Sequence, residues 1–166
     1  MFLDASKAFD RVRHDLLFRR LLDCGVCPLY IRIISIMYSL NNAKVRWNDK
    51  LSSSFSMCNG IKQGSVLSAK LFAIYLDPLL NKIQSSNIGC HIGDTPANVF
   101  AYADDVVLLS PSVTSLNKLI NICENYSIEF DLKFNSSKSI LQVFGRCTMM
   151  DMSFWTFCPF VGKNYQ

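Results

Sequence analysis

The sequence is poor in charge, with only 18% of its 166 residues charged while half are hydrophobic. This balance excludes an intrinsically disordered chain and predicts a folded segment able to bury a core. It also lacks internal repeats and low-complexity linkers, which excludes a repeat array. The length fits one domain or part of a larger one.

Signals for a membrane or for secretion are lacking as well. The most apolar stretch, Leu29 to Leu40, is too short to span a bilayer and contains Arg32. Asp4, Asp10 and several arginines interrupt the N-terminal segment, which argues against a secretory signal. We therefore expect no membrane association.

The seven cysteines are odd in number and do not follow the spacing of a disulfide framework. We interpret them as reduced thiols of an intracellular protein, nuclear or cytoplasmic. Cys24 and Cys27 form a CxxC pair, but no second close pair follows, so a structural zinc is the lesser alternative. The net charge of +4 and the pI near 8.7 permit nucleic-acid contact without indicating it, because many domains are as basic.

Hydrophobic periodicity and turn residues predict an α+β fold, an antiparallel sheet with helices on one face. We expect strands at 2–3, 44–47, 54–57, 98–103, 106–109, 132–134 and 140–144, and helices over 16–22, 30–37, 66–83 and about 112–123. The 44–47 and 54–57 strands flank Asn48-Asp49, a turn signal. We assign 1–145 to one partial domain, and 146–166, rich in methionine and aromatic residues without periodicity, to a divergent tail.

Two adjacent acids, Asp104 and Asp105, lie between two apolar β-type runs, which suggests a tight hairpin. Desolvating two like charges is costly unless a cation compensates, and Mg²⁺ prefers carboxylate oxygens. The simpler alternative is a turn whose aspartates point to water. Asp4 also ends an apolar strand, and phosphoryl transfer with two metal ions needs carboxylates that converge from separate strands.

A loop with two glycines, Gly60 and Gly64, precedes the helix expected at 66–83. Glycines allow a turn and the close approach of backbone to a ligand at a helix N-terminus. Such a loop is common, so by itself it specifies no function.

Four segments in order nevertheless match one family. Phe2-Leu-Asp-Ala-Ser-Lys-Ala-Phe-Asp10, Gly60-Ile-Lys-Gln-Gly-Ser-Val-Leu-Ser68, Phe100-Ala-Tyr-Ala-Asp-Asp105 and Lys133-Phe-Asn-Ser-Ser-Lys138 resemble consecutive motifs of reverse transcriptases. The resemblance is closest to non-LTR (LINE-type) retrotransposon enzymes and runs from Met1 to about Phe144. It implies a polymerase palm that acts as an RNA-directed DNA polymerase on an RNA template, a DNA primer and dNTPs.

The resemblance also implies residue roles. Asp4 and Asp104 are the expected principal ligands of two Mg²⁺ or Mn²⁺ ions, with Asp105 a third acidic member. Phe9 is expected to exclude a ribose 2′-hydroxyl, and Gln63 and Gly64 to touch nucleotide and template; for Phe9, core packing is the alternative. Tyr102 is expected beside the primer end. Lys138 is expected to protonate pyrophosphate, although a lysine in a loop is more often simply solvated.

The chain also departs from the family pattern. Met1 begins directly on the first palm strand, so we expect the fingers and the thumb to be missing, and Ala69 stands where relatives often have Pro. Two alternatives remain open. One is an intron-maturase-type reverse transcriptase or an RNA-templated RNA polymerase, the latter disfavoured by Phe9. The other is an inactive retroelement relic with residual nucleic-acid binding.

Overall fold

The computed structural model describes residues 1–144, and the predicted tail at 146–166 lies outside these residues. The chain divides into two compact units. One runs from Phe9 to Tyr75, and the other combines Met1–Ala8 with the chain from Leu76 onward. We call them the middle unit and the terminal unit and describe each by itself. The boundary falls within helix α3 (Ser68–Ser85), and the domain end predicted at 145 remains a prediction.

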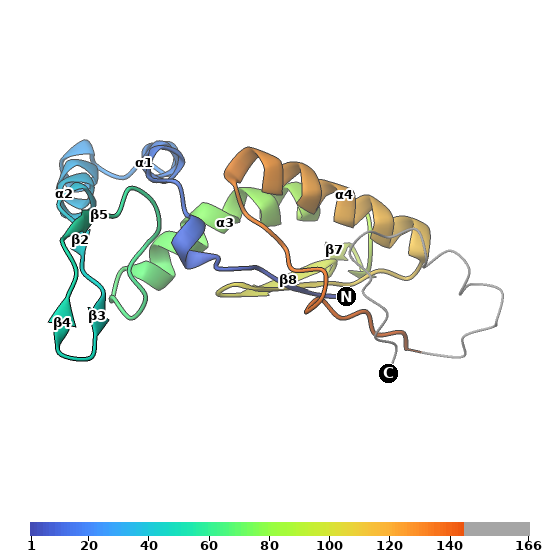
Figure 1. The fold of residues 1–166 in the computed structure, drawn as a ribbon. Coiled ribbons are helices and arrows are strands. Elements are labelled where there is room, and N and C mark those ends of the chain that lie inside the picture. The colour runs from blue at the N-terminus through green and yellow to red at the C-terminus, as the bar shows by residue number, and fades with distance from the viewer. Residues whose placement is uncertain (145–166) are drawn as a thin grey trace. The chain divides into compact units, whose positions relative to one another are not determined.

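The terminal unit is built on a three-stranded antiparallel sheet of β1 (Phe2–Asp4), β8 (Val99–Tyr102) and β9 (Asp105–Leu108), in the order β1-β9-β8 (Figure 1). Leu3 and Ala101 both lie opposite Val106, and Leu3 and Val106 are buried. The alternate residues Phe2 and Phe100 both lie opposite Val107 and are about half exposed. Since side chains alternate along a strand, the sheet has one buried face and one open face.

Helix α4 (Val113–Phe130) belongs to the same unit. Ser112 caps its N-terminus, with the Ser112 Oγ accepting a hydrogen bond from the Ser115 N–H at 3.2 Å. Its buried residues recur at helical spacing: Leu116, Leu119, Ile120, Cys123 and Tyr126. Figure 1 shows α4 on one side of the strands, which agrees with the burial of only one sheet face.

The middle unit holds the short 3-10 helix η1 (Phe9–Arg11), α1 (His14–Asp23), α2 (Pro28–Ser39) and the beginning of α3. Its two small two-stranded sheets pair β2 (Asn42–Ala43) with β5 (Phe55–Ser56) and β3 (Arg46–Trp47) with β4 (Lys50–Leu51). Gly25, with φ 75°, follows the end of α1, close to residue 22, where the sequence predicted this helix to end. Pro28 then opens α2 in its first turn, where a missing backbone N–H costs nothing.

Three expectations about strands need correction. The strand after the Asn48-Asp49 turn is 50–51, and Phe55–Ser56 pairs with Asn42–Ala43 instead of with 46–47. The strands expected at 132–134 and 140–144 are only single bridges, from Phe134 and Ile140, because a turn around Asn135 separates them. The hairpin of β6 (His91–Ile92) and β7 (Thr95–Pro96) was not predicted.

The predicted combination of helices with antiparallel strands is confirmed. Among residues 1–144, no helix has the length and apolar character needed to cross a membrane.

Candidate functional site

The acidic pair Asp104-Asp105 lies at the tip of the β8–β9 hairpin, as predicted. Tyr102 and Asp105 form the last cross-strand pair, so Ala103 and Asp104 make the turn. Ala103 has φ 53°, in the left-handed region that costs an alanine about 1 kcal/mol. Strain of this kind concentrates at functional positions, which directs attention to this turn.

The antiparallel register brings Asp4 to the same hairpin. Asp4, the last residue of β1, lies directly opposite Asp105, which in turn lies opposite Tyr102. Residues that oppose each other in a sheet point to the same face, with Cβ atoms about 5 Å apart. Asp4, Asp105 and Tyr102 therefore share the open face. The structure thus joins residues a hundred positions apart, and Asp105, not Asp104, is the direct partner of Asp4.

These carboxylates have no basic partner within residues 1–144, where no Lys or Arg forms an ion pair with Asp4, Asp104 or Asp105. Asp4 and Asp104 are partly buried and Asp105 is exposed. Like charges directly opposite each other in a sheet are destabilising. A hard divalent cation would offset that repulsion, and carboxylate oxygens are the ligands it prefers. The chemistry of the donor set therefore fits Mg²⁺.

The geometry alone does not complete a metal site. Among the described residues, no three His, Cys, Asp or Glu side chains are gathered closely enough to hold a metal ion. The Asp4–Asp105 pair supplies two carboxylates. A third ligand would have to come from Asp104 in the turn, from substrate phosphate or from water.

The end of β1 is held by the segment that contains Lys138. The Asn135 N–H donates to the Asp4 carbonyl at 2.7 Å, and the Asp4 N–H donates to Ser139 Oγ at 3.3 Å. Ser139 Oγ in turn donates to the Asn135 carbonyl at 2.7 Å. Lys138 itself is exposed in this turn. The fourth sequence motif therefore positions the backbone of Asp4, which the sequence did not suggest.

The open sheet face carries apolar residues next to the acids. Phe2 and Phe100 occupy the row beside the Asp4–Asp105–Tyr102 row, and Ile140 bridges to Phe2 at the sheet edge. Their exposed fractions are 46%, 54% and 52%. Sequence reasoning missed this row, although counting back by two from Tyr102 places Phe100 on the same face. The aspartates therefore border an uncovered apolar strip within this unit.

In the middle unit, Phe9 begins η1 and is only partly buried. Its ring stacks on Phe72, with centroids 4.8 Å apart and planes inclined by 23°. Phe72 is fully buried in α3. Phe9 therefore combines packing on one side with exposure on the other, so both of its predicted roles remain compatible with the structure.

The glycine loop lies against η1 within the same unit. Gly60 N–H donates to the Val12 carbonyl and Ile61 N–H to the Phe9 carbonyl, both at 2.8 Å. Gly60 has φ 87°, and a Cβ there would lie 2.9 Å from the Asp10 carbonyl oxygen. Any other residue at position 60 would meet backbone that cannot easily move.

The tip of this loop is open. Gln63 and Gly64 are both exposed, and Gly64 has φ 79° with free space around it. The loop thus has a fixed start and an accessible tip, a form suited to contact with a ligand.

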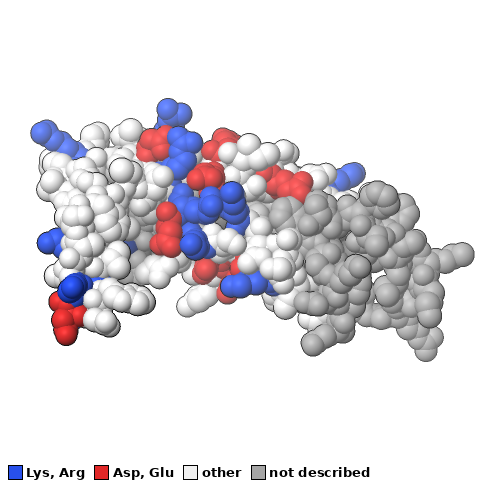
Figure 2. Space-filling view, in the orientation of Figure 1, with Lys and Arg blue, Asp and Glu red and all other residues white. Residues whose placement is uncertain are grey.

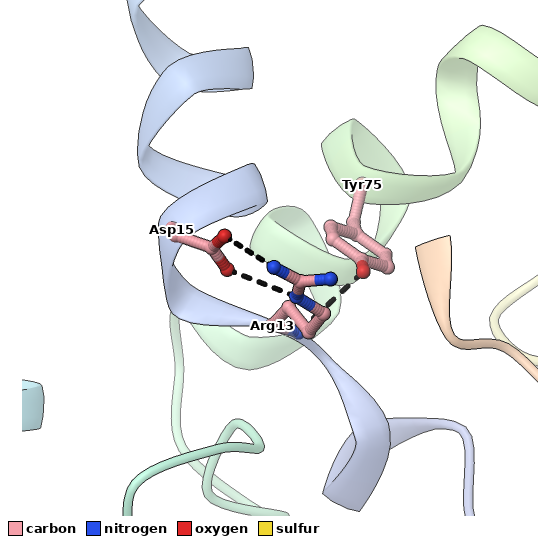
Figure 3. Close-up of polar contacts among 3 residues, drawn as sticks. All are labelled: Arg13, Asp15 and Tyr75. Atoms are coloured by element: carbon pink, nitrogen blue, oxygen red, sulfur yellow. Dashed lines mark hydrogen bonds and ion pairs between the residues drawn. The ribbon is translucent and has the colours of Figure 1, made fainter. Parts of the chain in front are cut away.

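Around the start of α1, Arg13 makes a two-pronged ion pair with Asp15 (Figure 3). Arg13 Nε donates to Asp15 Oδ1 at 3.1 Å and Nη2 to Oδ2 at 2.6 Å, which lowers the pKa of Asp15. The Arg13 backbone N–H donates to the hydroxyl of the buried Tyr75 at 3.4 Å. Arg13 therefore connects the start of α1 to α3 within the middle unit.

On the face drawn in Figure 2, charge does not single out a binding surface. Basic and acidic side chains are interspersed on this face. The net charge of +4 is therefore not gathered there into a patch of one sign.

Comparison with known proteins identifies the family. A sequence model described as reverse transcriptase (RNA-dependent DNA polymerase) matches residues 1–149. The chain belongs to this reverse transcriptase family.

Its relatives are proteins of mobile elements. The chain is 33% identical over 141 residues to a retrovirus-related Pol polyprotein from the type-1 retrotransposable element R2 of Popillia japonica, covering 83% of the chain and 20% of that protein. It is 30% identical over 136 residues to the polyprotein of element R2DM of Drosophila melanogaster, covering 82% of the chain and 13% of that protein. The chain is also 30% identical over 139 residues to the transposon TX1 uncharacterized 149 kDa protein of Xenopus laevis. This match covers 82% of the chain and 11% of that protein. The chain thus spans roughly a tenth to a fifth of the length of these relatives.

Proposed function

We propose that this chain is the palm portion of an RNA-directed DNA polymerase of a non-LTR retrotransposon. The reaction is attack of a primer 3′-hydroxyl on the α-phosphorus of a dNTP, with pyrophosphate released and an RNA strand as template. One observation carries the proposal: Asp4 lies opposite Asp105 at the tip of a strained hairpin, in a chain that matches the reverse transcriptase family over 1–149.

Asp4, Asp104 and Asp105 would hold two Mg²⁺ or Mn²⁺ ions. Bound there, the ions would lower the pKa of the attacking hydroxyl and steady the charge on the phosphorus oxygens. The protein's own part is to keep two carboxylates fixed on one sheet face. Asn135 and Ser139 do so by holding the backbone of Asp4.

The remaining roles follow the resemblance. Phe9, supported from behind by Phe72, would form the wall that excludes a 2′-hydroxyl. Gln63 and Gly64 would contact the nucleotide and the template from the open loop tip. Tyr102, which is 84% exposed in the row of Asp4 and Asp105, would pack beside the primer end. Lys138, exposed in the turn that follows Asn135, would donate a proton to pyrophosphate.

Primer extension on an RNA template tests this function. The chain is grafted into the R2 polyprotein of Popillia japonica in place of its matching segment, because the chain covers only 20% of that protein. We expect Mg²⁺-dependent DNA synthesis that falls at least about hundredfold in Asp4→Asn and Asp105→Asn, or ~2.7 kcal/mol.

Asp94→Asn, the same chemical change in the exposed β6–β7 turn, is the matched control and should keep full activity. A folded graft that makes no DNA, or undiminished synthesis by both aspartate variants, would refute the proposal. Nucleic-acid binding without DNA synthesis would favour the alternative that the chain is an inactive retroelement relic.

A further inference from the structure

We propose that His14 is a positioning residue that holds the loop from Gly60 to Ser68 in the shape that receives the nucleotide. The inference rests on the proposed function, since it assumes that Gln63 and Gly64 of this loop meet the dNTP. All the residues involved belong to the middle unit.

The first contact fixes the start of the loop. His14 Nε2 lies 2.7 Å from the Gly60 carbonyl oxygen. A carbonyl can only accept a hydrogen bond, so Nε2 carries the proton and donates. Two backbone bonds, from Gly60 to Val12 and from Ile61 to Phe9, align the same stretch. His14 is therefore the one side chain among these bonds, and it comes from α1, 46 positions earlier in the sequence.

The second contact fixes the end of the loop. Ser68, the first residue of α3, is 2% exposed, and its Oγ donates to the Lys62 carbonyl. Tyr38 of α2, in the same unit, is 8% exposed. The loop is thus closed on itself by a buried serine.

The ring of His14 lies between two aromatic rings of the same unit. Its ring lies 5.1 Å from the Tyr38 ring and 5.9 Å from the Phe18 ring, centroid to centroid. The histidine is therefore clamped by aromatic rings on its own and the next helix while its Nε2 reaches the loop. Displacements of about 1 Å in a positioning group can cost a hundredfold in rate, so such support has catalytic consequences.

The contrasting explanation is that His14 only fills space between two aromatic rings. Two substitutions separate these explanations. His14→Phe keeps a ring for packing but leaves the Gly60 carbonyl without its donor. His14→Gln removes the ring but offers an amide N–H near the position of Nε2. If His14 only packs, His14→Phe should stay closer to the wild type than His14→Gln. If His14 positions the loop, His14→Gln should stay closer.

The kinetic test uses the same R2 graft. We expect His14→Phe to raise KM for dNTP about tenfold while KM for the primer–template stays unchanged. His14→Gln should restore KM for dNTP to within about threefold of the wild type. His91→Phe, which changes the chain's other histidine on exposed β6, is the matched control and should behave as the wild type.

Hydrogen exchange on the full 166-residue chain gives a readout that needs no activity. The amides from Gly60 to Ser68 should exchange at least about fivefold faster in His14→Phe, and those of α4 should not change. Unchanged exchange and unchanged KM in His14→Phe, or equal damage by both substitutions, would overturn the inference. A wild-type graft without activity would instead overturn the proposed function, while faster exchange would still establish the contact.

Discussion

The opposed pair Asp4–Asp105 makes a quantitative prediction about stability. Replacing Asp105 by Asn removes one of two like charges on opposed residues, whose Cβ atoms lie about 5 Å apart. Coulomb's law gives about 0.8 kcal/mol for that separation in water and about 3 kcal/mol at an effective dielectric constant of 20. Because Asp105 is exposed, the value lies near the lower limit. Without a divalent ion, Asp105→Asn should therefore be more stable than the wild type by about 1 kcal/mol.

Adding Mg²⁺ should reverse this order. A ligand that binds only the folded chain stabilises it by RT ln(1 + [L]/Kd), about 2.7 kcal/mol at a hundred times Kd. Loss of one carboxylate should weaken binding at least about tenfold, which corresponds to ~1.4 kcal/mol at saturation. This lost stabilisation by Mg²⁺ is larger than the about 1 kcal/mol gained when the charge repulsion is removed. With Mg²⁺ bound, the wild type should therefore be more stable than Asp105→Asn.

Urea denaturation at a series of Mg²⁺ concentrations measures both effects. The ionic strength must be kept constant with NaCl, because salt alone screens the repulsion between exposed charges. Asp94→Asn controls for the loss of a negative charge elsewhere and should follow the wild type at every concentration. Parallel curves for wild type and Asp105→Asn, with no crossing, would refute the reasoning that these carboxylates share a cation.

Other predictions concern single side chains. In the R2 graft, Phe9→Val should raise the use of rNTPs relative to dNTPs about tenfold in kcat/KM, or ~1.4 kcal/mol; an unchanged ratio with intact DNA synthesis would mean that Phe9 only packs. Burial raises the pKa of the Cys123 thiol to about 12, so maleimide should label the exposed Cys58 in the native chain and spare Cys123, and rapid labelling of Cys123 would contradict its burial. The hydrogen bond from Arg13 lowers the pKa of Asp15 below its ordinary 3.8. The stability that the Arg13–Asp15 ion pair contributes is therefore complete above pH 3.8 and is lost as the pH falls through the lower pKa of Asp15 in the folded chain. Asp15→Asn should cost less than about 1 kcal/mol in urea denaturation at pH 7, and this cost should shrink as the pH is lowered below 3.8. A cost that does not change with pH would exclude the ion pair as its cause.

The sequence predicted those helices, strands and turns whose formation depends on residues close together in the chain. The β8–β9 hairpin was predictable because two apolar runs flank Asp104-Asp105, although the turn falls at Ala103-Asp104 and Asp105 already belongs to β9. The stop of α1 was predictable because Gly25 adopts a positive φ at little cost. The hairpin of 91–92 and 95–96 was missed although Gly93-Asp94 is a turn signal, because strands of two residues leave no alternation to detect.

Contacts between distant segments had no such signal. The bond from His14 to Gly60 joins a side chain to a backbone carbonyl, and any residue at position 60 would present the same carbonyl. The hydrogen bond from the Asp4 N–H to Ser139 Oγ likewise joins a backbone group, which every residue type except proline carries, to a distant side chain. The sequence could therefore predict that Asp4 and the glycine loop matter, but not which residues keep them in place.

The alternation of side chains along a strand, together with the register, decides which acid lies opposite Asp4. Adjacent residues of a strand point to opposite faces, so Asp104 and Asp105 cannot both project from the open face while both are in the strand. The register gives that place to Asp105 and leaves Asp104 in the turn, after Ala103 with its left-handed backbone. A turn residue is not bound by the alternation, so the strained Ala103 is what would free Asp104 to approach the Asp4–Asp105 pair. In the proposed metal site, adjacent carboxylates would reach one cation only because the turn departs from the regular strand, and the strain at Ala103 would then have a function.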